Sequence, residues 1–289
     1  MQVINSRHTK KCTVFLAARS RVARPVVDEW PKYADIGGNL LTVGRQAHPT
    51  IHTIWDMADP APEWHFDQPP VIVCFAGITP RSGQNLDGNT DLALAAQRAA
   101  DIWGARHVFH LSSAAVYGDC GPAPISEHPD PTPQGAYGTA KLAMERALIG
   151  SHTPHTVLRL GNVAGAGQPF DAATNPTQPK LDQFADGAGP SRSYIGPLSL
   201  ARVLAHVCQA AHEGAVLPRL LNVAAPRPTA MADIFSALGR DWQWIKAPDA
   251  AIQMVHLDTT RLDALCRLAP ETGLAQTLIN EITQECARR

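Results

Sequence analysis

The chain has 289 residues, of which 45% are hydrophobic and 18% charged, and its formal net charge is -1 at pH 7. This composition is typical of a globular protein with a sizeable core and excludes an intrinsically disordered chain. A charge so close to zero, without a long basic run, argues against nucleic acid or an anionic membrane as the main partner.

The sequence predicts a cytoplasmic protein without a membrane anchor. Its first residues, MQVINSRHTKK, lack the apolar core of a signal peptide, and no segment approaches the roughly 18 apolar residues of a membrane span. The six cysteines are scattered, with no Cys-x-x-Cys pair, which fits a reduced compartment. The pairs His48/His52 and His152/His155 have ligand-like spacing but lie in loop-like sequence without a third ligand, so we expect no metal site.

Short apolar runs alternate with longer helical patterns in the first 165 residues. Nearly continuous apolar stretches predict buried strands over residues 12–18, 39–44, 50–56, 70–77, 107–113 and 155–163. Helices are predicted over 92–105 and 135–150, the first with Gly104 as its C-terminal stop. The alternation predicts an α/β fold with a doubly wound parallel sheet, whose active site lies at the carboxyl ends of the strands.

The sequence changes character after Gly165. Residues 166–192 are rich in Pro, Gly, Asn and Asp and predict an irregular segment. An amphipathic helix over 198–214 and a strand over 219–225 follow, and the remainder mixes short helices with loops. We therefore expect a main domain over residues 1–165 and a smaller lobe over 166–289, with 198–225 returning to the core of the main domain.

The stretch AYGTAK places Tyr137 and Lys141 at the start of a predicted helix. Residues four apart project from the same side of a helix. A free phenol, with a pKa near 10, is a poor acid or base at neutral pH, but a nearby ammonium group and the helix N-terminus both lower that pKa. The pair is therefore predicted to be a tuned proton donor and acceptor. Two amphipathic side chains on one helical face are the simpler alternative.

Ser113 ends the strand before this helix, in the stretch HLSSAAVYG. A serine hydroxyl at the carboxyl end of a strand can orient a carbonyl or hydroxyl of a substrate beside the tyrosine of the next helix. Ser113, Tyr137 and Lys141 together suit hydride transfer at a carbon that bears oxygen, in which a cofactor takes the hydride and Tyr137 handles the proton. A hydrolase with Ser113 as nucleophile is a weaker alternative, because no G-x-S-x-G surrounds this serine.

The stretches SSAAVYG, YGTAK and LRLGNVAGAG, in this order, resemble the extended short-chain dehydrogenase/reductase superfamily and, within it, the NAD-dependent epimerase/dehydratase group that acts on nucleotide sugars. The resemblance runs from about residue 12 to about residue 225. It implies a Rossmann fold in which Ser113 and Tyr137 are catalytic, while Lys141 tunes Tyr137 and binds the nicotinamide ribose. It also implies that residues 1–165 bind a dinucleotide and that residues 166–289 mainly form a substrate-binding lobe.

The resemblance assigns the diphosphate of the sugar nucleotide to two further residues. Asn162, in LGNV, matches the family's asparagine after a strand, and Arg192, in SRSYIGPLSLA, matches its arginine before a later helix. The alternatives are that Asn162 is a turn residue and that Arg192 is a solvated loop charge. Tyr117, in AVYG, is predicted to pack rather than to catalyse.

The turn after the first strand departs most from the family pattern. The family places G-x-x-G-x-x-G there, so that the backbone approaches the pyrophosphate and the helix packs closely. Here the glycine positions fall on Ala17, Ser20 and Ala23, and any of them that needs a positive φ is predicted to be strained. Arg19 and Arg21 either compensate by offering charge to phosphate or are solvated surface arginines.

The second strand bears on the choice of dinucleotide. NAD-preferring members end it with an acid for the ribose hydroxyls, but here Gly44 stands at that position and Arg45 follows. Arg45 can pair with a 2′-phosphate, so NADP(H) is favoured over NAD(H), with a solvated strand-end charge as the alternative. Asp56 matches the family acid that contacts the adenine amino group, or else it is a turn residue. Ala76 and Gly77, after the fourth strand, suit a close approach to the cofactor.

The sequence therefore predicts an NAD(P)-dependent oxidoreductase or epimerase acting on a nucleotide-activated sugar, with Tyr137 as general acid/base. NADP(H) would favour net reduction of a keto-sugar over epimerisation, which needs a tightly retained NAD. A non-catalytic sensor or scaffold is the alternative; the missing glycines favour it and the retained Ser-Tyr-Lys set opposes it. The resemblance also implies a homodimer in which helices 92–104 and 137–149 form a four-helix bundle.

Overall fold

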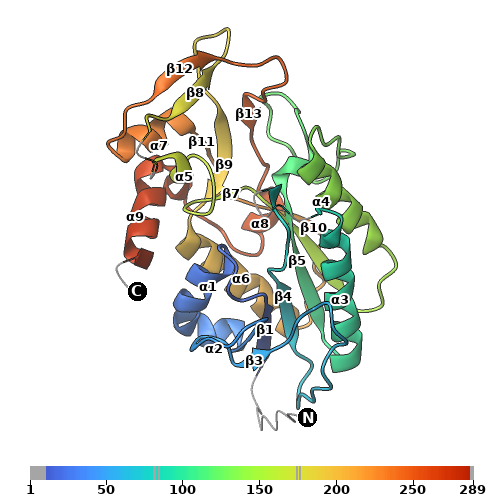
Figure 1. Ribbon diagram of the computed structural model, residues 1–289. Helices are drawn as coiled ribbons and strands as arrows, with labels where there is room; N and C mark the ends of the chain where they lie inside the picture. The colour runs from blue at the N-terminus through green and yellow to red at the C-terminus, as the bar shows by residue number, and fades with distance from the viewer. Residues whose placement is uncertain (1–10, 81–82, 84, 174, 176, 287–289) are drawn as a thin grey trace.

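A seven-stranded sheet, in which every neighbouring pair of strands runs parallel, forms the centre of the protein (Figure 1). The computed structural model describes residues 11–80, 83, 85–173, 175 and 177–286. The strands are, in sheet order, β10 (Leu220–Val223), β6 (His155–Leu160), β5 (His107–Ser113), β4 (Val71–Cys74), β1 (Cys12–Leu16), β2 (Asn39–Gly44) and β3 (Thr53–Ile54). The predicted doubly wound parallel sheet is confirmed.

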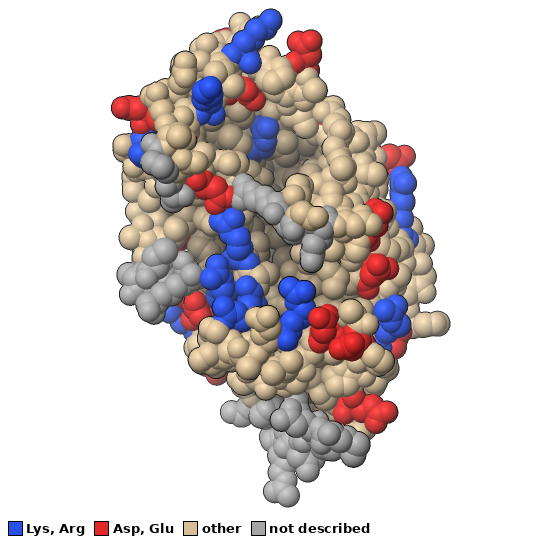
Figure 2. Space-filling view, in the orientation of Figure 1, with Lys and Arg blue, Asp and Glu red and all other residues tan. Residues whose placement is uncertain are grey.

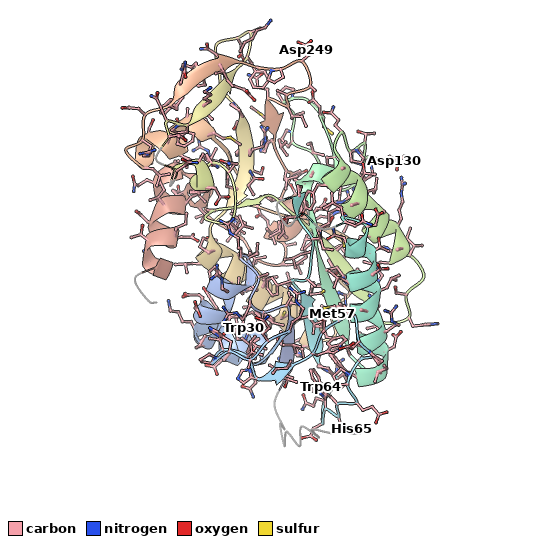
Figure 3. The ribbon with its side chains drawn as sticks, in the orientation of Figure 1. Trp30, Met57, Trp64, His65, Asp130 and Asp249 are labelled. Carbon is pink, nitrogen blue, oxygen red and sulfur yellow. The ribbon has the colours of Figure 1, made fainter. Side chains whose placement is uncertain are left out.

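Helices cover both faces of this sheet. On one face lie α1 (Ala23–Glu29), α2 (Ala34–Gly37) and α6 (Pro197–His212), and on the other lie α3 (Gly88–Trp103) and α4 (Ala136–Ala147). Successive strand residues point to opposite faces, so Phe15 packs with Trp30 in the first core while Val14 and Leu16 pack with Trp64 in the second. Figure 3 shows Trp30 beside α1 and Trp64 on the α3 side of the sheet.

The C-terminal lobe is built from small elements. Its central strand, β9 (Ser191–Ile195), pairs with β7 (Asn162–Val163), β11 (Pro228–Ala230) and β13 (Met254–Val255). A two-stranded sheet joins β8 (Lys180–Gln183) to β12 (Gln243–Lys246). The lobe helices are α5 (Phe170–Ala173), α7 (Met231–Ala237), α8 (Thr260–Asp263) and α9 (Ala275–Cys286). Short 3-10 helices are η1 (Trp30–Tyr33), η3 (Ala114–Val116) and η4 (Pro270–Gly273).

The predicted strands of the sheet are found, some with changed boundaries. β2 and β5 have the predicted ranges, whereas β3 keeps only two of the residues in 50–56. The segment 166–192, predicted to be irregular, contains α5 and β8, and α9 is a helix of 12 residues where the sequence predicts short helices. β8 escapes prediction because its partner is distant in the chain: Lys180 pairs with Gln243.

One glycine brings α4 against the end of β5. η3 follows β5 directly, and the first turn of α4 lies beside it. A Cβ at Gly138 would overlap the carbonyl oxygen of Ala115, a backbone atom that cannot move aside like the end of a flexible side chain. The glycine of AYGTAK therefore allows α4 to place Tyr137 close to Ser113.

Among the described residues, no helix is both long and apolar enough to cross a membrane. In the same part of the chain, no group of three His, Cys, Asp or Glu side chains is placed to hold a metal ion. The first histidine pair interacts with threonines instead: His48 Nδ1 lies 2.9 Å from the Thr50 hydroxyl, and His52 Nδ1 lies 2.7 Å from the Thr42 hydroxyl.

Candidate active site

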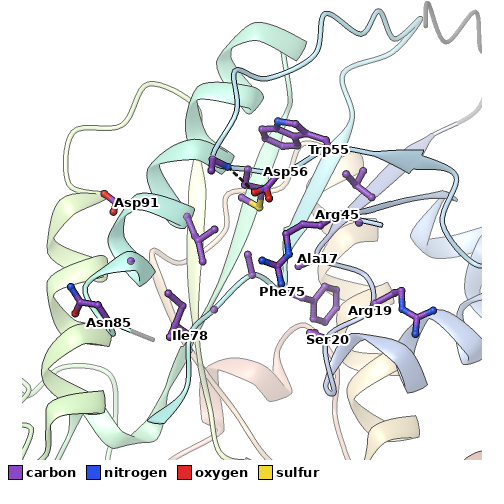
Figure 4. A pocket seen from close by; sticks show the side chains of 18 residues that line it. Ala17, Arg19, Ser20, Arg45, Trp55, Asp56, Phe75, Ile78, Asn85 and Asp91 are labelled. Atoms are coloured by element: carbon purple, nitrogen blue, oxygen red, sulfur yellow. Dashed lines mark hydrogen bonds between the residues drawn. The ribbon is translucent and has the colours of Figure 1, made fainter. Parts of the chain in front are cut away.

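A cavity of about 810 Å³ opens at the carboxyl ends of β1, β2 and β4 (Figure 4). In the sheet β1 lies between β2 and β4, so the chain crosses to the other side of β1 after β3. Such a reversal of strand order opens a crevice between the loops that follow adjacent strands. Six of the eight residues predicted to bind a dinucleotide line this cavity: Ala17, Ser20, Arg45, Asp56, Ala76 and Gly77.

The turn after β1 keeps a glycine-like backbone without a glycine. Ala17 has a φ of 54°, and among the described residues it is the only non-glycine with a positive φ. Its carbonyl oxygen accepts a hydrogen bond from the Ser20 N–H at 3.0 Å, and the Ala18 N–H donates to the Val43 carbonyl oxygen at 3.0 Å. A residue with a Cβ in this left-handed region costs about 1 kcal/mol. The strain predicted from the sequence is therefore present at the first replaced glycine.

The other two replaced glycine positions serve the helix that follows. Ser20 lines the cavity, and its hydroxyl oxygen accepts a hydrogen bond from the Ala23 N–H at 3.1 Å, at the start of α1. Ala23 is fully buried in the core between α1 and the sheet, outside the cavity wall. The structure thus places Ala23 in helix packing, and its assignment to cofactor binding stays a prediction.

Exposed arginines surround this turn, and they have different partners. Figure 2 shows Lys and Arg side chains gathered beside the hollow in the middle of this face. Arg21 donates to both carboxylate oxygens of Asp171 in α5, at 2.6 and 3.3 Å, and therefore joins the turn to the lobe. Arg19 and Arg45 are the described cations of the cavity wall, and Figure 4 shows Arg45 extending into the cavity.

The end of β2 has little free space at Gly44. A Cβ at Gly44 would lie 3.0 Å from Cδ1 of Ile51, so the Ile51 side chain fills the space that a longer residue would need. Asp56 lines the cavity, and its Oδ1 accepts a hydrogen bond from the Ala58 N–H at 3.1 Å. Asp56 is therefore a turn residue that also lines the cavity. Its predicted contact with the adenine amino group stays a prediction.

Ser113 and Tyr137 meet where β5 ends and α4 begins. The Ser113 hydroxyl oxygen accepts a hydrogen bond from the Ala115 N–H at 3.2 Å. Burial raises the pKa of Tyr137, and the nearby Ser113 hydroxyl offsets this rise only in part. The phenol is therefore protonated at neutral pH.

Lys141 binds a strand carbonyl in this structure, and the pKa of Tyr137 is raised rather than lowered; the tuning of Tyr137 by Lys141 stays a prediction. Lys141 Nζ donates to the carbonyl oxygen of Leu111 in β5 at 3.0 Å, and the side chain is almost fully buried. Burial removes the ammonium from water and lowers the pKa of Lys141 to about 8. Helical spacing fixes the side of the helix from which a long side chain leaves, but it does not fix where the charged end lies.

Gly77 connects this group to the cavity. A Cβ at Gly77 would lie 3.2 Å from Lys141 Nζ and 3.4 Å from Asn89 Oδ1, so Lys141 lies directly behind the cavity wall. Asn89, buried in α3, holds the loop: its Oδ1 accepts from the Ile78 N–H and its Nδ2 donates to the Ile78 carbonyl oxygen, both at 3.0 Å. Sequence reasoning misses Asn89, because a single asparagine in a helical run matches no motif.

The two residues predicted to hold a diphosphate lie in the sheet of the lobe. Asn162 on β7 pairs with Tyr194 on β9, and its side chain lowers the pKa of the Tyr194 phenol, which burial raises. Arg192 donates three hydrogen bonds of 2.7 to 2.9 Å to backbone carbonyl oxygens of β9 and of residues 252–253. Arg192 is therefore not a solvated loop charge, and in this conformation its terminal nitrogens are bound to backbone.

A buried ion pair lies on the far side of Lys141 from Tyr137 along α4. Glu145 binds Arg159 of β6 at 2.7 Å, and the two side chains are only 5% and 3% exposed. The Arg159 guanidinium lies 4.7 Å from the centre of the Tyr117 ring, whose full burial confirms its predicted packing role. A glutamate in a helix and an arginine in a strand give no sequence signal until the fold brings them together.

Residues 79–212 match the sequence model of a family described as the NAD dependent epimerase/dehydratase family. This range contains Ser113, Tyr137 and Lys141, and it begins after β4, so it leaves out the turn at Ala17. The predicted resemblance to this family is confirmed over the matched range. No curated protein sequence matches the chain.

Solved structures share the fold at low sequence identity. A UDP-N-acetylglucosamine 4-epimerase from Methanobrevibacter ruminantium M1, in complex with UDP-N-acetylmuramic acid, is 16% identical with a TM-score of 0.72, over 95% of this chain and 99% of that one. A UDP-glucose-4-epimerase from Stenotrophomonas maltophila, with bound NAD and formylated UDP-arabinopyranose, is 16% identical with a TM-score of 0.73, over 96% and 99%. A UDP-glucose 4-epimerase from Bifidobacterium longum, in complex with NAD+ and UDP, is 16% identical with a TM-score of 0.71, over 96% and 100%. These likenesses establish a Rossmann-like α/β fold.

Substitution of Ala17 tests the strained turn. We expect Ala17→Gly to keep or raise the free energy of unfolding, by up to about 1 kcal/mol, because the relieved strain offsets the larger entropy of the unfolded glycine. Ala17→Val should lower it by about 2 kcal/mol, since a β-branched residue is disfavoured at a positive φ. Urea unfolding at pH 7 measures both changes. Ala58→Gly, at an exposed position with ordinary φ, is the control and should lose stability; an Ala17→Val variant of full stability would contradict the strain.

Proposed function

We propose, from the family match over residues 79–212, that the protein is an NAD(P)-dependent enzyme acting on a nucleotide-activated sugar, with Tyr137 as its proton donor. The observation that carries this proposal is the shared wall at Gly77, with the cavity on one side and Lys141 Nζ on the other. Ser113 and Tyr137 lie at the adjacent strand end. A dinucleotide in the cavity would therefore share a wall with the Ser-Tyr-Lys group.

The residues around the cavity fit such a cofactor. Gly77 leaves open the space that a Cβ would fill in front of Lys141, and the backbone of Ala17 keeps the conformation of a phosphate-binding turn. Arg19 and Arg45 provide positive charge for phosphate, which compensates for the missing glycines. Gly44 stands where an acid would bind the ribose hydroxyls of NAD, and Ile51 fills the space beside it. We therefore favour NADP(H) over NAD(H).

The side chains suggest how the proton moves. The cofactor, when bound, supplies hydride transfer to or from a carbon that bears oxygen. Ser113 orients the substrate oxygen with its hydroxyl, and Tyr137 gives its proton to that oxygen as negative charge builds there. The phenolate that remains keeps its hydrogen bond from Ser113. A resting phenol suits reduction of a keto-sugar, because oxidation of an alcohol needs the phenolate first.

The sugar nucleotide itself belongs, in this proposal, between the sheet and the lobe, near Asn162. Arg192 can bind its diphosphate only after the backbone carbonyl oxygens of residues 252–253 release the guanidinium. Substrate binding would then move the segment before β13. A smaller substrate would leave these hydrogen bonds in place.

Titration with NADPH and NADH, followed by nicotinamide fluorescence, tests the cofactor. We expect NADPH to bind more tightly, and Arg45→Met to weaken NADPH binding about tenfold while NADH binding stays unchanged, because the lost contact is to the 2′-phosphate. Arg24→Met removes an exposed arginine outside the cavity wall and is the matched control. If neither dinucleotide binds at high micromolar concentration, the proposed function fails and a non-catalytic sensor or scaffold takes its place.

Substitution of Tyr137 tests the proton transfer. Tyr137→Phe should reduce turnover of a sugar-nucleotide substrate by about 100-fold or more, because the general acid is removed while the ring still packs. Its affinity for the dinucleotide should change little. Tyr33→Phe, a half-buried tyrosine in η1, is the control and should keep full turnover. Equal turnover of Tyr137→Phe and wild type would exclude Tyr137 as the acid.

A homodimer through α3 and α4 remains a prediction, and two exposed apolar side chains support it. Ile102 on α3 is 55% exposed, and Ile149, just after α4, is 68% exposed. Light scattering at micromolar concentration should give twice the mass of the chain, and Ile102→Glu or Ile149→Glu should shift it towards monomer. Val216→Glu changes another exposed apolar residue and should leave the dimer intact. A wild-type monomer would contradict the prediction.

A further inference from the structure

A buried polar cluster behind the catalytic residues takes no part in the proton transfer described above. It joins Ser112 on β5, Glu145 on α4 and Arg159 on β6. We propose that the ion pair of Glu145 with Arg159 is a positioning element that fixes the place of Lys141 and keeps it charged. The expected effect on turnover rests on the proposed function. The expected effect of Glu145 on the pKa of Lys141 does not, because it can be measured in protein without cofactor.

The cluster holds the middle of α4 firmly against two strands. Arg159 Nη2 donates to Glu145 at 2.7 Å, and Arg159 Nε lies 3.2 Å from both carboxylate oxygens. The Ser112 hydroxyl donates to the same carboxylate at 2.5 Å. Four hydrogen-bond contacts to one buried carboxylate fix its position. Because Lys141 lies one turn earlier on α4, its backbone is held with that of Glu145, and the Leu111 carbonyl oxygen then accepts the hydrogen bond from its Nζ at 3.0 Å.

Glu145 is also the charged neighbour of Lys141. The titratable groups that act on or with Lys141 are Cys74 on β4, His110 on β5 and Glu145 on α4, while α3 contributes the neutral Asn89. Burial raises the pKa of Cys74 to about 11 and lowers that of His110 to about 3, so both are neutral at pH 7. Cys74 and Glu145 both raise the pKa of Lys141, and because the Cys74 thiol is neutral at pH 7, Glu145 is the group in this set whose effect operates there.

Two effects therefore compete at Lys141. Burial disfavours the ammonium, and the carboxylate of Glu145 favours it. Arg159 has an indirect part, because a buried carboxylate without a partner would take up a proton and lose its effect on Lys141. The ion pair thus maintains a positive charge behind Gly77, on the wall that faces the proposed dinucleotide.

The titration of Lys141 can be measured directly. The chain has only six lysines, so ε-13C-lysine labelling gives a resolvable NMR spectrum in which Lys141→Arg identifies the signal. In wild-type protein without cofactor we expect a midpoint at about pH 8. In Glu145→Gln, which keeps the shape and an acceptor for Arg159, the midpoint should fall by roughly one pH unit, the size of effect that one nearby charge produces.

Two further variants make the result decisive. Glu213→Gln removes an exposed carboxylate that lies 3.7 Å from Lys11, and it should leave the Lys141 midpoint unchanged. If Glu145→Gln fails to fold because Arg159 is left unpaired, Glu145→Gln/Arg159→Gln removes both charges, and its midpoint should still fall because Glu145 is the direct neighbour. A folded variant of either kind with the wild-type midpoint would overturn the proposal.

The same variants separate this inference from the proposed function. If wild-type protein binds a dinucleotide and turns over a substrate, the pH profile of kcat/KM should shift down with Lys141 in Glu145→Gln, which a merely structural role would not produce. An unshifted profile and midpoint would reject the ion pair as a positioning element while the enzyme assignment stands. A shifted midpoint in a protein that binds no dinucleotide would reject the enzyme assignment while the effect on Lys141 stands.

Discussion

The order of strands around β1 is the constraint on which the rest of the structure depends. Because β2 and β4 flank β1 in a wholly parallel sheet, the chain must leave β3 and return on the other side, and the loops after β1 and β4 diverge. The cavity follows from this divergence rather than from any glycine-rich motif. Ala17 illustrates the point: the sheet imposes a left-handed backbone there, although an alanine in this conformation destabilises the folded state.

Burial, more than charge pairing, controls the chemistry of the candidate site. Loss of water raises the pKa of Tyr137 and lowers that of Lys141, so both changes favour neutral side chains. The charged exception is the ion pair of Glu145 with Arg159, which is itself almost fully buried. Removing one member of such a pair costs about 3–5 kcal/mol, because the remaining buried charge is left without a partner.

Sequence reasoning identified the parts of the fold that depend on local pattern. β2 and β5 are continuous apolar runs, and Ser113 and Tyr137 come together because one ends a strand and the other begins the next helix. It missed what depends on long-range pairing, such as β8. It also does not predict the contacts of long side chains: Lys141 donates to a strand carbonyl oxygen, and Arg192 donates to backbone carbonyl oxygens.

The close approach at Gly138 also limits which parts of the site can move relative to one another. Gly138 in the first turn of α4 lies against the Ala115 carbonyl of η3, which directly follows Ser113, so Ser113 and Tyr137 are held together by closely packed backbone. The lobe contacts the turn after β1 through Arg21 and Asp171. Under the proposed function, a shift of the lobe would change access to the substrate site and leave the spacing between Ser113 and Tyr137 constant.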